Sequence, residues 1–98
     1  MEPLLRDQSS FPWFVYILEC ADQSLYTGMT SNITRRLEEH NSHRGGHYTR
    51  CFGQVKLLWS EEHPDQFSAA KRERQLKGWT RLKKLALIEG NLILLKKL

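Results

Sequence analysis

Hydrophobic and aromatic residues fill nearly every position from Trp13 to Cys20. A continuous apolar run of this length is typical of a strand that is buried on both faces. A second run, Ser24 to Met29, follows after Asp22-Gln23 and predicts an antiparallel hairpin. A simple two-residue loop would place Tyr16 and Tyr26 on opposite faces of this hairpin, whereas an odd loop or a bulge would place them on one face. The two tyrosines can therefore share a site only if the hairpin has an odd or bulged register.

The pattern changes to a helical period after the second run. Thr30, Ser31 and Asn32 offer N-caps for a helix that continues to about Asn41. On a wheel of about 100° per residue, one face holds an apolar pair together with two chemically active side chains, namely Ile33, Leu37, Arg36 and His40. The opposite face holds Arg35, Glu38 and Glu39. We therefore expect Arg36, and not Arg35, on the inward side.

The second half of the chain predicts one more strand and two or three helices. Residues 42–53 contain three glycines and indicate a long loop, and Gln54 to Ser60 is predicted to be the third strand. A helix begins at Pro64 or a neighbouring residue, runs to Lys77 and stops at Gly78. Its inward face is predicted to hold Ala69, Ala70, Glu73 and Leu76.

Thr80 can cap a further helix that stops at Gly90, with Leu82, Leu85 and Ala86 inward. Asn91 to Leu98 is either a short docked helix or a frayed tail. The order β-β-α-β-α-α predicts a small α/β (α+β) domain with a three-stranded, mostly antiparallel sheet flanked by helices.

Length and composition allow one domain. The chain has 98 residues, of which 40% are hydrophobic and 27% are charged. We expect a flexible segment at 1–10, a domain at 11–90 and the short helix or tail at 91–98. No stretch approaches the ~20 apolar residues that a membrane span needs, and no signal peptide is evident, so we expect a cytoplasmic monomer. In such a setting Cys20 and Cys51 are interpreted as reduced thiols and not as a disulfide.

Positive charge is concentrated near the C-terminus. The whole chain carries a net charge of +4, whereas residues 71–97 hold nine basic residues and two acidic residues, a net charge of +7. Such asymmetry favours a polyanionic partner, because lysine and arginine side chains near phosphates release condensed counterions. The alternative is a solvated helical face.

Five side chains along the chain have functional groups that suggest a site for phosphodiester hydrolysis. They are Tyr16, Tyr26, Arg36, His40 and Glu73. Phosphodiester hydrolysis can be built from two phenols, a guanidinium and an imidazole, provided that a carboxylate supplies a metal site.

Each of these residues also has a structural interpretation. The tyrosines could be core residues, Arg36 could pair internally with Glu19 or Glu73, His40 could be a helix-end residue, and Glu73 could pair with Lys77.

These features resemble the GIY-YIG endonuclease superfamily over residues 13 to about 90. Phe14-Val15-Tyr16 and Tyr26-Thr27-Gly28 stand where the family has Gly-Ile-Tyr and Tyr-Ile-Gly. Tyr48-Thr49-Arg50 and the segment Leu76 to Arg81 are similar to those of the small single-domain bacterial members, the UPF0213-like proteins. No counterpart of the late asparagine of some members is evident.

The resemblance implies hydrolysis of a DNA phosphodiester bond at a single Mg²⁺ or Mn²⁺. It implies that Glu73 holds the metal, that Arg36 contacts the scissile phosphate, and that Tyr16 or Tyr26 acts as general base or orients the water. His40 would accept a proton or bond the phosphate, and Tyr48 is a lesser catalytic candidate. Gly28 would be structural. The residues expected to guide the nucleic-acid backbone are Arg50, Lys77, Arg81, Lys83 and Lys84.

Two other functions remain open on the sequence. One is a nucleic-acid-binding module of the same fold without turnover, for which phosphate contacts alone would explain the basic segment. The other is a protein-interaction domain that uses the apolar tail Leu92 to Leu98. We expect DNA, branched or single-stranded forms included, as the partner, and the sequence favours the endonuclease.

Overall fold

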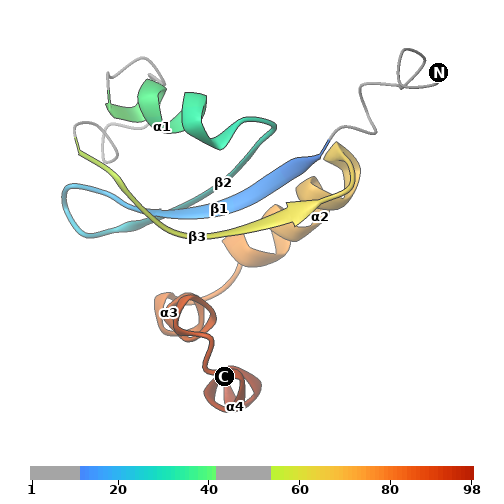
Figure 1. Cartoon of the computed structure of the whole chain (residues 1–98). Coiled ribbons are helices and arrows are strands. Elements are labelled where there is room, and N and C mark those ends of the chain that lie inside the picture. The colour runs from blue at the N-terminus through green and yellow to red at the C-terminus, as the bar shows by residue number, and fades with distance from the viewer. Residues whose placement is uncertain (1–11, 42–53) are drawn as a thin grey trace.

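A computed structural model describes residues 12–41 and 54–98. The elements lie in the order β1 (Trp13–Glu19), β2 (Leu25–Thr30), α1 (Ile33–Asn41), β3 (Lys56–His63), α2 (Gln66–Lys77), α3 (Arg81–Glu89) and α4 (Leu92–Lys97) (Figure 1). The sheet has the strand order β2-β1-β3, and both pairings are antiparallel. The predicted fold class is therefore confirmed, and the last segment is a short helix. The segment 1–10 and the predicted loop 42–53 lie outside the described residues.

The hairpin has the odd register that a shared tyrosine site requires. Tyr16 pairs with Gly28, and Leu18 pairs with Tyr26. Paired residues of an antiparallel sheet project to the same face, and so do residues two apart on one strand. Tyr16 and Tyr26 therefore lie on one face of the sheet.

The loop between the two strands explains this register. The backbone N–H of Cys20 donates to the carbonyl of Ser24 at 2.9 Å, and the N–H of Gln23 donates to the carbonyl of Cys20 at 2.8 Å. Three residues thus close the turn, and Gln23 adopts the left-handed conformation with φ 71°. A turn followed by one left-handed residue is a common three-residue hairpin, and its odd length sets the register.

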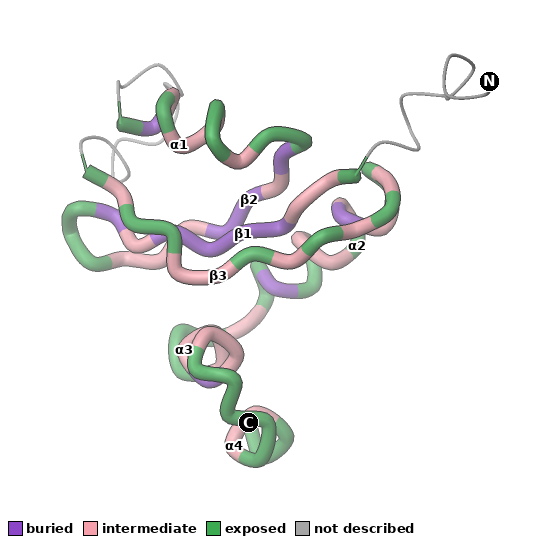
Figure 2. The backbone as a smooth tube through the Cα atoms, in the orientation of Figure 1, coloured by how far each residue is buried: buried purple, intermediate pink, exposed green. Residues whose placement is uncertain are grey.

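The two faces of the sheet carry different layers. On one face, Val15 of β1 packs with Ala69 and Leu76 of α2, all three fully buried. Partly buried side chains surround this cluster, namely Trp13, Met29, Trp59, Trp79 and Leu87. On the other face, Tyr16 lines a small pocket with Ile33, Arg36 and Leu37 of α1. Figure 2 shows that burial is most continuous along β1, as predicted for a strand covered on both faces.

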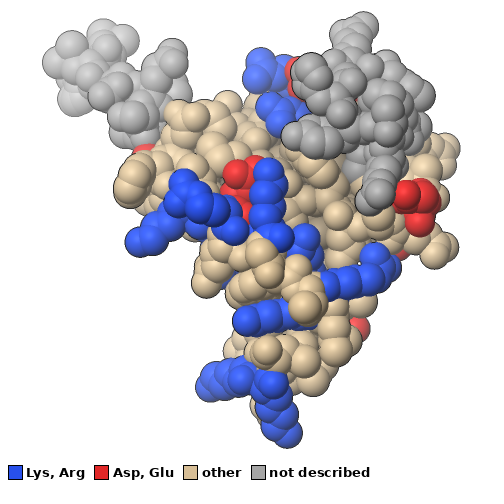
Figure 3. Space-filling model, turned by 180° about the vertical axis from the view of Figure 1, so that it is seen from behind, with Lys and Arg blue, Asp and Glu red and all other residues tan. Residues whose placement is uncertain are grey.

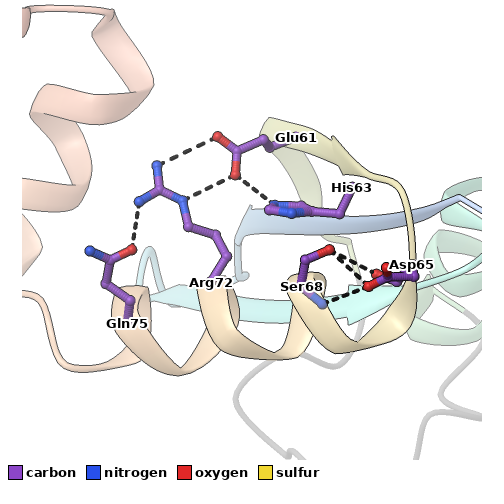
Figure 4. A network of polar contacts seen from close by, with 6 residues as sticks. All are labelled: Glu61, His63, Asp65, Ser68, Arg72 and Gln75. Carbon is purple, nitrogen blue, oxygen red and sulfur yellow. Dashed lines mark hydrogen bonds and ion pairs between the residues drawn. The ribbon is translucent and has the colours of Figure 1, made fainter.

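A polar network joins β3 to α2 (Figure 4). Glu61 accepts hydrogen bonds from Arg72 Nε at 3.0 Å, and its Oε1 lies 2.8 Å from Nε2 of His63. Arg72 Nη1 also donates to Gln75 at 2.7 Å. The helix starts at Gln66, two residues after Pro64, because Asp65 is the N-cap and accepts from the N–H of Ser68 at 2.8 Å.

Some predicted details differ from the structure. β3 continues to His63, three residues beyond the predicted end, because it pairs with β1 as far as Trp13. Leu82 was predicted to face inward but is 55% exposed, since the inward face of α3 is formed around Ala86. Leu92 and Ile93 of α4 are also largely exposed. Among the described helices, none is long and apolar enough to cross a membrane.

The state of Cys20 also differs from the prediction. Cys20 is disulfide-bonded, so the interpretation as a reduced thiol is wrong. Two cysteines far apart in the chain pair only if the fold brings them together, and their spacing in the sequence does not reveal this. Cys51 lies outside the described residues.

Candidate active site

Tyr16 lies directly over Gly28 of the neighbouring strand. A Cβ atom at position 28 would lie 2.5 Å from Tyr16 Oη, 2.7 Å from Tyr16 Cζ and 3.0 Å from Tyr26 Cε2. Such distances are too short for any side chain, so only glycine fits. Because β2 is an edge strand, the missing side chain lets the phenol of Tyr16 reach across it.

Tyr26 and His40 continue this cluster. The ring centroids of Tyr16 and Tyr26 are 6.3 Å apart, and those of Tyr26 and His40 are 5.4 Å apart with an edge-to-face geometry. His40 stands in the last turn of α1 and is 5% exposed. Aromatic pairs prefer an edge-to-face arrangement, so the rings of Tyr26 and His40 support each other.

Arg36 enters the cluster from the first part of α1. The helix begins where Asn32 accepts a hydrogen bond from the N–H of Arg35 at 3.0 Å. Nη1 of Arg36 donates to Tyr16 Oη at 3.5 Å, and Nε donates to Glu39 at 3.1 Å. Arg36 is therefore on the inward side, as predicted. Its carboxylate partner is Glu39 and not Glu19 or Glu73.

Glu39 is the residue that the sequence reasoning missed. The wheel placed it on the outward face, but its side chain turns to Arg36 and is 34% exposed. Residues three apart are neighbours on a helix surface, so the spacing of Arg36 and Glu39 was the available signal.

The electrostatics of Tyr16 and Arg36 are coupled. Burial raises the pKa of Tyr16, the hydrogen bond and charge of Arg36 oppose this rise, and the charges of Glu73 and Glu39 add to it. The net result is a pKa above the usual 10.0 of a phenol. For Arg36, burial lowers the pKa, but the contacts with Tyr16 and Glu39 outweigh it and raise the pKa overall. At neutral pH the site thus presents a neutral phenol beside a charged guanidinium.

Glu73 lies on α2, the helix that packs on the Val15 face of the sheet. Its charge is felt at Tyr16, and its side chain is 21% exposed. Oε2 also forms an ion pair with Lys77 Nζ at 3.3 Å, as the alternative interpretation predicted. Within residues 12–41 and 54–98, no three or more histidine, cysteine or acidic side chains gather as a metal-binding group. A single carboxylate suits Mg²⁺ or Mn²⁺, which keep several waters, and does not suit a structural zinc site.

Comparison with known proteins identifies the family. The family model of the GIY-YIG catalytic domain matches residues 12–86. This chain belongs to the GIY-YIG family.

Relatives with the same domain are similar over most of their length. A UPF0213 protein of Desulfotalea psychrophila is 42% identical over 93 residues, which cover 93% of this chain and 84% of the relative. A UPF0213 protein of Syntrophus aciditrophicus is 48% identical over 79 residues, or 80% of this chain and 91% of the relative. The solution NMR structure of a UPF0213 protein from Bacillus halodurans matches with a TM-score of 0.53 and 38% identity, covering 80% of this chain and 83% of that one.

The basic segment of this GIY-YIG domain is partly engaged in structural contacts. Arg81 Nη1 donates to the carbonyl of Gln23 in the hairpin loop at 2.9 Å, and Lys83 Nζ lies 4.5 Å from the ring centroid of Trp79. Burial, and then the charge of Lys77, lower the pKa of Lys84. Figure 3 shows basic side chains spread over this part of the molecule, with few acidic ones among them.

Two predicted site residues remain outside this description. Tyr48 and Arg50 lie beyond the described residues. Tyr16, Tyr26, Arg36 and His40 are brought together on the face of the GIY-YIG sheet that α1 covers. Glu73 lies on α2, and its charge raises the pKa of Tyr16.

Proposed function

We propose that this protein is a metal-dependent endonuclease that hydrolyses DNA phosphodiester bonds with structural selectivity or weak sequence preference. The observation that carries the proposal is the convergence of the phenols of Tyr16 and Tyr26, the imidazole of His40 and the guanidinium of Arg36 on one face of the sheet. Membership of the GIY-YIG family supports it, because that family's catalytic domain is the part that matches.

Arg36 is proposed to bind the scissile phosphate. Its guanidinium stays charged at all working pH values, and its flat fork of donors matches phosphate oxygens. Negative charge on the phosphate increases as water attacks, so this contact strengthens towards the transition state. Arg36 thus binds the substrate and stabilises the transition state.

The raised pKa of Tyr16 separates the roles of the two phenols. A general base must lose its proton near the working pH, and Tyr16 resists this. We therefore assign Tyr16 as the donor that orients the phosphate or the water. Tyr26 is then the proposed base for the attacking water, and His40, whose ring lies edge-to-face with that of Tyr26 at 5.4 Å, is the proposed acceptor of the proton.

Glu73 is the proposed metal ligand. When bound, a single Mg²⁺ or Mn²⁺ supplies charge stabilisation for the departing 3′-oxygen and the non-bridging oxygen. The half-buried carboxylate of Glu73 suits a metal ion that takes few protein ligands. In this structure the carboxylate is paired with the ammonium group of Lys77.

Cleavage of branched, nicked and single-stranded DNA in Mn²⁺ tests this function. Arg36→Ala and Glu73→Gln should each lower kcat/KM about 10²–10³-fold, because each removes a charge that acts on the transition state. Arg35→Ala and Glu89→Gln make the same changes of charge at exposed positions and should retain activity within about threefold. Absence of cleavage of every substrate, or equal activity of Arg36→Ala and Arg35→Ala, would contradict the proposal.

A second candidate is a nucleic-acid-binding module without turnover. The ion pair between Glu73 and Lys77 favours it, since the carboxylate already has a cation as its partner. Lys83 and Lys84 would then contribute phosphate contacts. Affinity for DNA that falls steeply with salt, with intact DNA after long incubation in Mg²⁺ and Mn²⁺, would support this candidate over the endonuclease.

A further inference from the structure

The guanidinium of Arg36 is held on two sides. Nε donates to Oε1 of Glu39 at 3.1 Å, and Nη1 donates to Oη of Tyr16 at 3.5 Å. A guanidinium has five N–H donors in one plane. Among the described residues, the side chain of Arg36 makes its hydrogen bonds through Nε and Nη1. The group therefore presents one nitrogen whose direction is set by the two contacts at its other nitrogens.

The carboxylate of Glu39 lies closer to Arg36 than to Arg35. Oε1 accepts from Arg36 Nε, while Oε2 lies 3.8 Å from Nε of Arg35. The side chains of Glu39 and Arg36 are each 34% exposed, whereas that of Arg35 is 63% exposed. Glu39 thus stands between an inward and an outward arginine of the same helix, and the helical spacing of three residues brings it to the inward one.

We propose that Glu39 is a positioning residue that holds the guanidinium of Arg36 against Tyr16 and leaves Nη2 directed at the scissile phosphate. The inference rests on the proposed endonuclease function. A long arginine side chain without this carboxylate would sample several rotamers, and its contact with the phosphate would form less often. Misplacement of a catalytic group by about 1 Å can lower a rate up to 10²-fold.

Two substitutions at position 39 separate position from charge. Glu39→Gln and Glu39→Ala both remove the negative charge, but only glutamine keeps an oxygen that can accept from Arg36 Nε. Glu38→Ala is the matched control, because Glu38 is an exposed acid on the same helix. Alanine favours helix formation, so all three variants should fold, and thermal unfolding checks this.

The first readout is the pKa of Tyr16, which needs no DNA. It is followed by the ¹³Cζ resonance of labelled tyrosine, assigned by its loss in Tyr16→Phe. Contact with Arg36 lowers the pKa of this phenol. We therefore expect a higher pKa in Glu39→Ala than in Glu39→Gln, and no change in Glu38→Ala. Equal values in the alanine and glutamine variants at position 39 would overturn the proposal.

The second readout is cleavage. Glu39→Ala should lower kcat about tenfold, and Glu39→Gln should remain within about threefold of the wild type. An equal loss in both variants would show that charge, and not position, is what Glu39 supplies. If the wild type cleaves no DNA, the endonuclease proposal fails, whereas the resonance of Tyr16 still decides whether Glu39 holds Arg36.

Discussion

Neighbouring residues of β1 contribute to an apolar core on one face of the sheet and to a polar cluster on the other. Val15 points to α2 and joins an apolar cluster with Ala69 and Leu76. Tyr16, the next residue, points to α1 and meets Arg36 and Tyr26. All six residues lie on β1 or on an element that contacts it.

This comparison shows how a small domain separates stability from chemistry. Burial of apolar area stabilises the α2 face in proportion to the area removed from water, and it needs no particular geometry. On the α1 face, polar groups are buried, and their free energy depends on direction and charge. We therefore expect substitutions on the α2 face to change only the free energy of unfolding, and those on the α1 face to change the pKa or the resonance of Tyr16 as well.

The largest effect on stability is expected at Leu76. This side chain is fully buried. Leu76→Ala should lower the free energy of unfolding by about 3 kcal/mol, because it leaves a cavity in the core. Leu82→Ala, at a leucine that is 55% exposed, should change it by less than about 1 kcal/mol. Urea unfolding measures both changes. If the pKa of Tyr16 is the same in folded Leu76→Ala as in the wild type, the core on the α2 face can change without affecting the α1 face.

The next effect is expected at Gly28, on the α1 face. Gly28→Ala introduces a Cβ atom 2.5 Å from Tyr16 Oη. Either the phenol or β2 must shift, which should cost about 1–3 kcal/mol and displace the Tyr16 resonance.

Gly78→Ala is the matched control for this substitution. The nearest atom to its new Cβ would be the carbonyl oxygen of Gln75 at 3.6 Å, an ordinary contact. A Gly28→Ala protein as stable as Gly78→Ala, with the same Tyr16 resonance as the wild type, would break the comparison.

A smaller effect is expected from alkaline pH. The pKa of Tyr16 is raised in the folded protein, mainly by burial, so the folded state holds this proton more tightly than the unfolded state. The resulting stability is fully present below the unfolded value of 10.0 and is lost as pH rises through the folded pKa.

Tyr16→Phe lacks this ionisation. The difference in free energy of unfolding between the two proteins should therefore move in favour of Tyr16→Phe as pH rises above about 10, where a phenol titrates. Urea unfolding at several pH values measures it, and a constant difference would contradict the burial of Tyr16.

The smallest effect is expected at the start of α2. Hydrogen bonds from Ser68 lower the pKa of Asp65, so this carboxylate stabilises the fold above its usual pKa of 3.8, and the stabilisation is lost as pH falls through the lower folded value. Asp65→Asn keeps a good N-cap without the charge. Its melting temperature should be slightly below that of the wild type at pH 7 and equal to it near pH 2; an equal difference at both pH values would contradict this.

Much of the fold could be predicted from local patterns. The caps Asn32, Thr80 and Gly90 mark the ends of helices where the structure has them, because capping depends on residues within one turn. The helical wheel placed Arg36 and His40 inward for a similar reason. The choice of Glu39 as the partner of Arg36, and the disulfide bond at Cys20, could not be predicted from local patterns, because each depends on where a second group lies in space.

By itself, the sequence determined which side chains were available and that Tyr16 and Tyr26 needed an odd register to meet. Only the tertiary structure showed that Tyr16 and Tyr26 lie on the same face of the sheet. The left-handed Gln23 closes a three-residue loop, and that single conformation sets the face of every residue in β2. A one-residue change of register would move Tyr26 and Gly28 to the face of Val15, because side chains alternate along a strand.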